Sequence, residues 1–226
     1  MKEKISVAID GPSGAGKSTI ARRIARQFGF IYVDTGAIYR TVGLAVARKN
    51  LSPKEKEAVL SLLPGIQVRL AYGEDGAQHM YLDGEDVSAV IRTPKISLFA
   101  SDVSAYPEVR AYLMEMQRSL ARENDVVMDG RDIGTVVLPN AGLKIFLTAS
   151  PEARARRRFD ELRAKGQDVA LEEVLQNLQQ RDENDSRRAA APLKAADDAM
   201  LLDTTSLDFD QSCAAVEKLI RERFGL

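Results

Sequence analysis

Cysteine and histidine are nearly missing from this chain of 226 residues, which has one of each, and tryptophan is absent. The single cysteine, Cys213, excludes a disulfide framework. One cysteine with one histidine also cannot assemble a Cys/His zinc site. Because a chain without disulfides suits a reducing compartment, we expect a cytoplasmic protein.

Long apolar runs and an excess of charge of one sign are lacking as well. No apolar stretch approaches the roughly 20 residues that a membrane helix needs, and the N-terminus lacks the apolar region of a signal peptide. The 32 basic and 33 acidic residues leave a formal net charge of −1 at pH 7. We therefore expect neither nucleic acid nor a membrane as a partner. The hydrophobic content of 45% is ordinary for a globular α/β domain.

The most informative stretch is GPSGAGKS at residues 11–18, which fits the G-x-x-x-x-G-K-[ST] pattern of a phosphate-binding P-loop. The β-branched run at residues 5–9 indicates a buried parallel strand just before it. Apolar residues at helical spacing follow as far as Phe28, and Gly29 suits a left-handed C-terminal cap. Strand, loop and helix thus occur in the order that the motif requires.

The residue types of this loop suit a phosphate chain. Successive backbone N–H groups can wrap phosphates only where side chains do not block the approach, which accounts for Gly11, Gly14 and Gly16. We expect the ammonium group of Lys17 on the surface of the loop, as a point charge for the phosphates. The hydroxyl of Ser18 would be offered to Mg²⁺, and the start of the helix adds the positive end of its dipole.

Apolar patterning along the rest of the chain predicts an α/β fold with one parallel sheet. Further strands of that sheet are expected at 30–33, 126–128, 145–147 and 200–202. Between 66 and 90 the pattern alternates and is punctuated by glycines, which predicts a small inserted antiparallel sheet with strands at 66–70 and 79–82. Helices are expected over 37–49, 52–63, 94–106, 107–122, 151–165, 171–188 and 209–224, with Cys213 on the packed face of the last one.

Two carboxylates follow or end buried strands, where α/β proteins place ligands. Asp129 comes after three apolar residues, the pattern of a Walker B carboxylate that holds Mg²⁺ directly or through water; a strand-end turn is the alternative. Asp10 precedes the P-loop, and it either does similar work or accepts hydrogen bonds from local backbone donors.

Arginines concentrate in residues 154–188. Phosphoryl transfer spreads negative charge over three equatorial oxygens, so fixed guanidinium groups near a P-loop are expected among the catalytic parts. Arg154 and Arg157 lie three residues apart on one helix face, and Arg181 and Arg188 lie seven apart on another. No partner that neutralises this segment is evident from the sequence, so we expect a hinged segment that closes on phosphates. Other arginines there, such as Arg156, suit a solvated face.

Five motifs together resemble those of the bacterial cytidylate kinases, members of the nucleoside monophosphate kinases. They are IDGPSGAGKST at 9–19, DTGAIYR at 34–40, LDGEDVSAVIRT at 82–93, DGRDIGTVVLP at 129–139 and RDENDSRRAAAPL at 181–193. The second and fourth are far more specific than the P-loop alone. Two departures are small: Thr35 stands where some members have serine, and Ser18 replaces a glycine of other members, so a metal contact there does not hold for the whole family.

The resemblance implies a single domain over 1–226 and a cytoplasmic enzyme. Its core would have five parallel strands in the order 2-3-1-4-5, formed by about 1–36, 123–153 and 189–226. A region that binds the nucleoside monophosphate, enlarged by the inserted sheet, would span about 37–122, and a short helical lid about 154–188. The implied reaction transfers the γ-phosphoryl group of ATP to CMP or dCMP, giving CDP or dCDP and ADP, with Mg²⁺. We expect a monomer whose partners are these small molecules.

Site residues carry over from the resemblance position by position. ATP would be bound by Gly11, Pro12, Ser13, Gly14, Ala15, Gly16, Lys17, Ser18, Thr19 and Arg158, with Mg²⁺ at Ser18 and Asp129. The acceptor phosphate would be held by Arg40, Arg131 and Arg188, near Thr35; the cytosine by Ser101, Arg110 and Asp132; the sugar by Arg181 and Asp185. The catalytic charges would be those of Lys17, Arg131, Arg154, Arg157 and Arg188. The resemblance leaves open which of Arg154, Arg157 and Arg158 touches the transferring phosphate.

Other functions remain as alternatives. The nearest is a kinase for another small acceptor. A P-loop GTPase switch would need a guanine-reading N-K-x-D motif, which the chain does not have. A regulator that binds nucleotide without catalysis is disfavoured by Lys17 and the arginine set. Because no pair of nucleophile and base is evident, we expect direct in-line transfer without a covalent intermediate.

Overall fold

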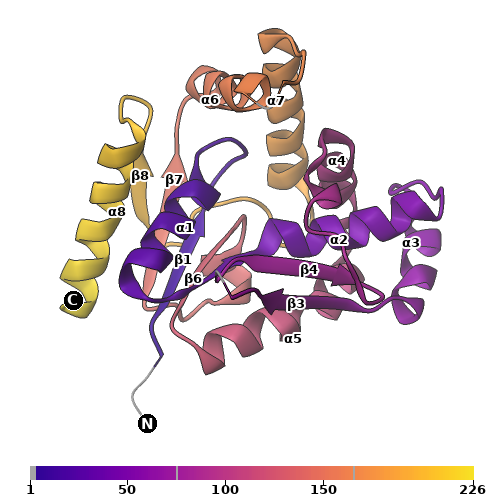
Figure 1. Ribbon diagram of the computed structural model, residues 1–226, viewed down its shortest axis with the longest axis horizontal. Helices are drawn as coiled ribbons and strands as arrows, with labels where there is room; N and C mark the ends of the chain where they lie inside the picture. The colour runs from indigo at the N-terminus through magenta and orange to yellow at the C-terminus, as the bar shows by residue number, and fades with distance from the viewer. Residues whose placement is uncertain (1–3, 75, 165) are drawn as a thin grey trace.

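A five-stranded parallel sheet lies at the centre of the computed structural model, which describes residues 4–74, 76–164 and 166–226 (Figure 1). Its strands are β1 (Ser6–Asp10), β2 (Ile31–Asp34), β6 (Val126–Gly130), β7 (Leu143–Thr148) and β8 (Met200–Asp203). They lie in the order β2-β6-β1-β7-β8. Numbered along the chain without the inserted strands, this order is 2-3-1-4-5, and the prediction for the sheet is confirmed.

Alternating side chains of these strands belong to two separate hydrophobic clusters, one on each face of the sheet. Val7 and Ile9 of β1 pack with α1 (Lys17–Phe28) and α8 (Phe209–Phe224), where Cys213 is buried as predicted. Ala8 packs with α2 (Thr35–Arg48) and α5 (Pro107–Glu123) on the opposite face. Since β6 is buried along its whole length, the centre of the sheet is a rigid base for the residues that follow its strands.

A three-stranded antiparallel sheet lies beside the main sheet, as predicted. It consists of β3 (Val68–Tyr72), β4 (Gln78–Leu82) and β5 (Glu85–Asp86). Short helices flank it on both sides in the chain: α3 (Lys56–Leu62), η1 (Leu63–Gly65), η2 (Val90–Arg92) and α4 (Pro94–Val103).

The helix expected from residue 52 starts later than predicted. Ser52 does not cap it, because the backbone N–H of Glu55 donates to the Ser52 carbonyl at 3.1 Å and closes a turn before α3 begins at Lys56.

The antiparallel sheet contacts the main one at the end of β2. There the side chain of Gln78 accepts from the Asp34 backbone N–H at 2.7 Å, and the Tyr72 hydroxyl donates to the Tyr32 carbonyl at 2.9 Å.

Two helices, α6 (Pro151–Ala164) and α7 (Leu171–Arg187), stand above the P-loop at the top of Figure 1. They pack on each other through a small cluster of their own, formed by Ala155, Leu162, Val174 and Leu178. The predicted end of the first helix at residue 165 lies outside the described residues, as do residues 1–3 of the expected core segment. A short π-helical turn, η3 (Ile133–Val137), follows β6 and was not predicted.

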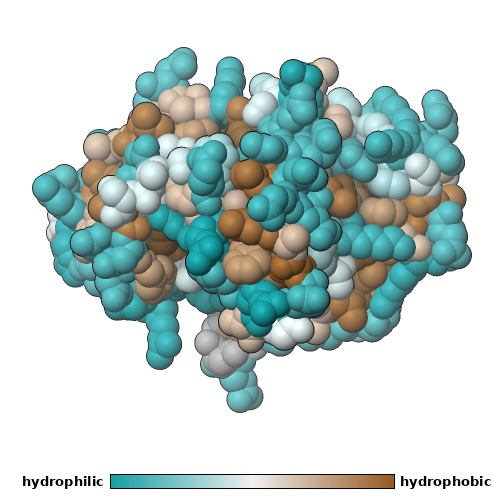
Figure 2. All heavy atoms as spheres, turned by 90° about the horizontal axis from the view of Figure 1, so that it is seen from above, coloured by the Kyte–Doolittle hydropathy of each residue, from teal (hydrophilic) through white to brown (hydrophobic). Residues whose placement is uncertain are grey.

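Seen from above, this side of the molecule is covered largely by hydrophilic side chains, with hydrophobic ones in patches between them (Figure 2). Within the ranges that the structure describes, no helix combines the length and the apolar character needed to cross a membrane.

Candidate active site

A cavity of about 830 Å³ lies where the P-loop, the turn after β6, and helices α2, α4, α5, α6 and α7 meet. The carboxyl ends of β2 and β6 border it through Asp34 and Asp129. The register, which pairs both Ile9 and Asp34 with Asp129, sets the end of β1 beside them. Most of the site residues predicted from the sequence line this cavity: Ser13, Gly14, Ala15, Gly16, Lys17, Ser18, Thr19, Thr35, Arg40, Ser101, Arg110, Asp129, Arg131, Asp132, Arg157, Arg158, Arg181, Asp185 and Arg188. Gly11, Pro12 and Arg154 are not among the lining residues.

The P-loop glycines are required by the backbone, though not all for the reason expected. Gly11 has φ +147°, and a Cβ atom there would lie 1.9 Å from the carbonyl oxygen of Leu147 on the neighbouring strand β7. Packing against β7 thus excludes a side chain at Gly11. Gly16, with φ 90°, is the N-cap of α1 and turns the chain into the helix.

Lys17 is buried, so the expectation of an exposed ammonium group was wrong. Its side chain folds back under the loop, and Nζ donates to the Pro12 carbonyl at 2.7 Å. Burial lowers the pKa of Lys17 to about 7, and the positive charge of Arg131 adds to that effect. Lys17 lines the cavity, where an added anion would favour its protonated form.

Ser18 and Asp129 lie beside Lys17, and each carries a side-chain oxygen of the kind that binds metal ions. The Ser18 hydroxyl donates to Asp129 Oδ2 at 2.8 Å, and the Tyr32 hydroxyl donates to Asp129 Oδ1 at 2.8 Å. Burial raises the pKa of Asp129, and the carboxylate of Asp34 raises it further. A cation beside this carboxylate would relieve that cost.

These residues fit a magnesium ion. Hydroxyl and carboxylate oxygens are ligands that Mg²⁺ accepts, and it usually takes one or two protein carboxylates and completes its shell with water and substrate phosphates. The part of the chain that the structure describes contains no group of three or more His, Cys, Asp or Glu side chains that could hold a metal by themselves. The Ser18 and Asp129 pair is therefore a site that would need phosphate oxygens to complete it.

Asp10 has the second of its two predicted roles. Its carboxylate accepts from the backbone N–H groups of Ile133 at 2.8 Å and Gly134 at 2.7 Å, which ties the start of η3 to the end of β1. Burial raises the pKa of Asp10 to about 6, although both backbone donors oppose the shift. Asp10 thus satisfies local donors at the turn that carries Arg131 and Asp132.

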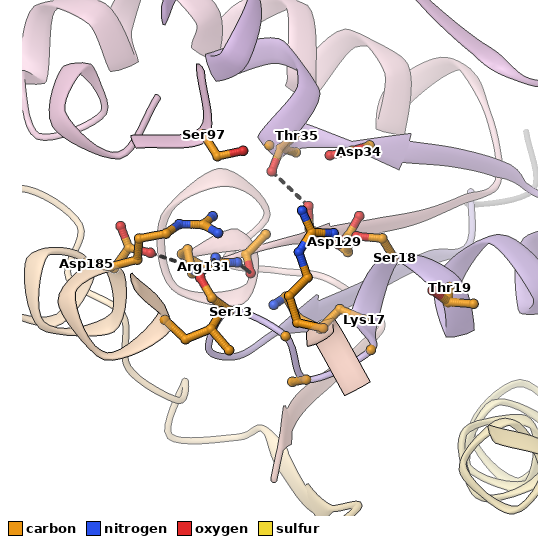
Figure 3. Close-up of a pocket in the computed structure, with 18 of the residues that line it drawn as sticks. Ser13, Lys17, Ser18, Thr19, Asp34, Thr35, Ser97, Asp129, Arg131 and Asp185 are labelled. Carbon is orange, nitrogen blue, oxygen red and sulfur yellow. Dashed lines mark hydrogen bonds and ion pairs between the residues drawn. The ribbon is translucent and has the colours of Figure 1, made fainter. Parts of the chain in front are cut away.

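Arg131 links the P-loop to helix α7. Its Nη2 donates to Ser13 Oγ at 2.7 Å, and its Nε donates to Asp185 Oδ2 at 2.8 Å (Figure 3). Burial alone would raise the pKa of Asp185, but the guanidinium groups of Arg131, Arg188 and Arg181 lower it overall. The carboxylate stays ionised between these cations, which fixes Arg131 in the middle of the cavity.

Arg181 is also buried, and fewer interactions offset the cost of burying its charge. Burial lowers its pKa to about 10, with the positive charge of Arg131 as the next cause. Its buried Nε is one of the side-chain atoms without a hydrogen-bond partner among the described residues. A buried donor left in this state costs free energy, and an anionic oxygen in the cavity would satisfy it.

A second cluster in the cavity centres on Asp132. Arg188 Nη2 donates to Asp132 Oδ1 at 3.1 Å, and Arg110 donates to Asp132 Oδ2. Asp132 is only 4% exposed, and burial raises its pKa against the pull of both arginines. Ser101 lies nearby and donates to Asp185 Oδ1 at 3.2 Å. Since a carboxylate oxygen has two lone pairs, Asp132 can accept a further hydrogen bond from a ligand.

The arginines of α6 have partners inside the protein, contrary to the expectation of an unneutralised segment. Arg154 pairs with Asp182 of α7, and Arg158 with Glu161. Arg157 donates to the carbonyl groups of Thr204 and Leu207. Arg157 and Arg158 still border the cavity, whereas Arg154 points to the backbone of the P-loop.

Several cavity residues were missed from the sequence, among them Arg22, Tyr39, Arg92, Ser97, Ser104 and Phe209. A signal existed for two of them, because Tyr39 lies in DTGAIYR and Arg92 in LDGEDVSAVIRT. Arg22 lies one helical turn after Ser18 and looks like any exposed helix residue. Phe209 enters the site from the C-terminal helix, far from every motif.

Comparisons with known proteins agree with this geometry. A family model described as cytidylate kinase matches residues 7–222. A cytidylate kinase of Caldicellulosiruptor bescii is 51% identical, over 96% of this chain and 96% of that protein. One from Desulfitobacterium hafniense is 47% identical, over 99% of this chain and 95% of that protein. Among solved structures, an uncharacterized protein from Eubacterium ventriosum matches with a TM-score of 0.55 at 10% identity, over 97% of this chain and all of that one, a likeness of fold alone.

Proposed function

Since this chain belongs to the cytidylate kinase family and is thus a CMP kinase with ATP as the phosphoryl donor, we propose that it uses dCMP as well as CMP, and that Mg²⁺ and arginines assist an in-line transfer. The products would be ADP and CDP or dCDP. No covalent enzyme intermediate is involved, because the acceptor phosphate itself is the nucleophile.

The observation that carries the proposal is the bridge made by Arg131. This guanidinium touches Ser13 of the P-loop on one side and Asp185 of α7 on the other. A phosphoryl group that leaves a nucleotide on the P-loop and moves toward the Asp185 side passes this cation. Charge that spreads over its equatorial oxygens would therefore meet a fixed, pre-oriented donor, which is the main requirement of the reaction.

On the donor side, backbone N–H groups of residues 14–18 would hold the phosphates of ATP, with the ammonium group of Lys17 below them. Ser18 and Asp129 would hold Mg²⁺, which neutralises phosphate charge and orients the β- and γ-phosphates when bound. Tyr32 keeps Asp129 in place by donating to its other oxygen.

On the acceptor side, the arginines would be divided between phosphate and nucleoside. Arg40, Arg131 and Arg188 would hold the phosphate of CMP near Thr35, where bidentate guanidinium contacts fix its orientation. Arg181 and Asp185 would hold the sugar hydroxyls. A deoxyribose lacks only one of these hydroxyls, so dCMP keeps its phosphate and base contacts.

The base would be read by Ser101, Arg110 and Asp132. Cytosine has an exocyclic amine that donates, where uracil has an oxygen that accepts. The buried carboxyl group of Asp132, held between Arg110 and Arg188, would accept from the amine of cytosine and would face the oxygen of uracil acceptor to acceptor. We propose that selectivity for cytosine rests on this carboxylate.

Residues 154–188, which comprise most of α6 and α7, are proposed to act as the lid, and 37–122 as the region that binds the monophosphate. Arg157 and Arg158 border the cavity from this lid. Binding of ATP and CMP together should slow amide hydrogen exchange in 154–188, since closure excludes water from the reacting groups. Equal exchange with and without both nucleotides would contradict a moving lid.

A coupled assay of ATP consumption tests the function and its finer parts. The acceptors are CMP, dCMP, UMP, AMP and shikimate, each with ATP at several Mg²⁺ concentrations. CMP and dCMP should be the best acceptors, and activity should vanish when Mg²⁺ is chelated. Preference for UMP, AMP or shikimate would contradict the assignment of the base-reading residues.

A further inference from the structure

Ser13, the third residue of the P-loop, is the point where the loop, helix α6 and helix α7 meet. Its backbone N–H donates to Asp182 Oδ1 at 2.9 Å, and its carbonyl accepts from Arg154 Nη1 at 2.8 Å. Its hydroxyl accepts from Arg131 Nη2 at 2.7 Å. Ser13 is 2% exposed. All of its polar groups are thus engaged with charged side chains from outside the loop.

Arg154 and Asp182 form a closed pair around this peptide. Arg154 is 6% exposed, and its Nε donates to the Ala149 carbonyl at 3.0 Å while Nη1 donates to both Ser13 and Asp182. Asp182 accepts from Ser13 with one oxygen and from Arg154 with the other. The charge of Arg154 is therefore matched inside the protein, next to the loop backbone, and the side chain does not border the cavity.

We propose that Asp182 is a positioning residue for phosphoryl transfer, which together with Arg154 fixes the Ser13 peptide and thereby the place of Arg131. The inference rests on the proposed function, in which Arg131 meets the transferring phosphoryl group. Asp182 does not line the cavity, so no direct contact with the nucleotides is proposed for it. It acts through Ser13, whose hydroxyl holds Arg131 in the cavity together with Asp185 and the Gly130 carbonyl.

The geometry explains why a carboxylate is needed at position 182. A carboxylate accepts with both oxygens, so it serves the Ser13 N–H and the Arg154 guanidinium at the same time. An asparagine has one acceptor oxygen and can serve only one of them. An alanine serves neither, and it leaves a buried cation unpaired beside the loop.

These contacts also connect helix α7 both to the P-loop and to Arg131. Asp182 contacts the donor loop, and Asp185, one turn later on the same helix, holds Arg131 at 2.8 Å. Figure 3 shows Arg131 reaching between Asp185 and Ser13. A shift of α7 would therefore move the Ser13 peptide and the Arg131 guanidinium together.

The test compares Asp182→Ala and Asp182→Asn with a control on the adjacent residue, Glu183→Gln. Glu183 pairs with Arg187 at the surface, where both side chains are about half or more exposed, so its loss should leave activity unchanged. For each variant we would measure kcat and KM for ATP and CMP, thermal stability, and hydrogen exchange of the P-loop peptide in nucleotide-free protein.

Asp182→Ala should lower kcat by roughly ten- to hundredfold, because a displacement of about 1 Å of a catalytic group costs up to about 10²-fold. KM for both substrates should change less than kcat, since the nucleotide contacts remain. Asp182→Asn should fall between alanine and wild type. In the alanine variant the P-loop peptide should exchange faster, while peptides of β1 and β6 exchange as in wild type.

Two results would overturn the proposal. One is a kcat of Asp182→Ala within about twofold of wild type; the other is a lower KM for ATP at unchanged kcat, which would mean that the carboxylate competes with a phosphate for the Ser13 N–H. If alanine fails to fold, the asparagine variant carries the same comparison. If wild type does not phosphorylate CMP, the proposed function fails. Independently of that, an unchanged rate of P-loop hydrogen exchange in Asp182→Ala would refute the claim that Asp182 fixes the Ser13 peptide.

Discussion

Replacing Asp132 by asparagine should reduce the preference for CMP over UMP without removing the side chain that fills the site. Asp132 is 4% exposed and lies between Arg110 and Arg188. Each of its oxygens accepts from one arginine and retains a lone pair for the base. The amine of cytosine can donate there, whereas the oxygen of uracil would face the acceptor oxygens of Asp132 at a buried position.

The size of the effect follows from the cost of a mismatched buried polar group, which is about 1–3 kcal/mol and more for a charged one. In wild type, kcat/KM for UMP should therefore be lower than for CMP by at least roughly ten- to hundredfold. An amide can turn either its oxygen to cytosine or its NH₂ group to uracil. In Asp132→Asn the two values should approach each other, mainly through loss of activity on CMP and gain on UMP.

Alanine at this position is a poorer probe. It would leave Arg110 and Arg188 buried without a counter-charge, a loss of about 3–5 kcal/mol in comparable cases, so activity and folding would fall together. The assay is steady-state kinetics with both acceptors, after thermal melts have shown that the asparagine variant is folded at the assay temperature. The reasoning is refuted if wild type uses UMP as well as CMP, or if the asparagine variant keeps the full discrimination.

Three other substitutions test neighbouring parts of the site. Lys17→Met should lower kcat by on the order of a hundredfold or more, as loss of a positioned charge does. Its melting temperature should not fall, since burial already disfavours the ammonium form; near-normal turnover would contradict the P-loop assignment. Tyr32→Phe removes the hydrogen bond to Asp129 and should raise the half-saturating Mg²⁺ concentration roughly fivefold, the equivalent of ~1 kcal/mol. An unchanged Mg²⁺ titration would exclude that role. Burial raises the pKa of Asp10 from 3.8 to about 6, so the folded state binds this proton more tightly and stability from this group falls as pH rises from about 4 to 6, by up to about 3 kcal/mol. Asp10→Asn should lack that slope in urea titrations between pH 4 and 7, and parallel pH profiles for the two proteins would refute the shift.

Much of the fold could be predicted because its signals are local. The buried runs of β1, β6 and β7 are short and apolar, and the P-loop stands between a strand and a helix, as its mechanism requires. The order of the strands came from the resemblance rather than from the pattern, since periodicity does not show which strands are neighbours. The late start of α3 was missed because Ser52 followed by Pro53 has the composition of a helix start, while tertiary contacts left that segment as a turn.

Contacts between residues that lie far apart in the sequence could not be predicted. Arg154 and Asp182 lie 28 residues apart on different helices, and nothing in either helix shows which carboxylate meets which guanidinium. The same holds for Lys17, whose pKa is shifted by the charges of Arg131 and Asp129, more than a hundred residues away in the chain. Gly11 was assigned to the phosphate approach, but its neighbour is Leu147 of β7, a contact that only the assembled sheet creates.

The most direct test of the account is the fate of the γ-phosphoryl group itself. ATP labelled with ³²P at the γ-position is incubated with CMP, Mg²⁺ and the protein, and the nucleotides are separated by anion-exchange chromatography. The account predicts that the label appears at the β-phosphate of CDP, in amounts equal to the ADP formed, and that Lys17→Met forms neither product at a comparable rate. Label released as inorganic phosphate, or retained in ATP while CMP is unchanged, would contradict it.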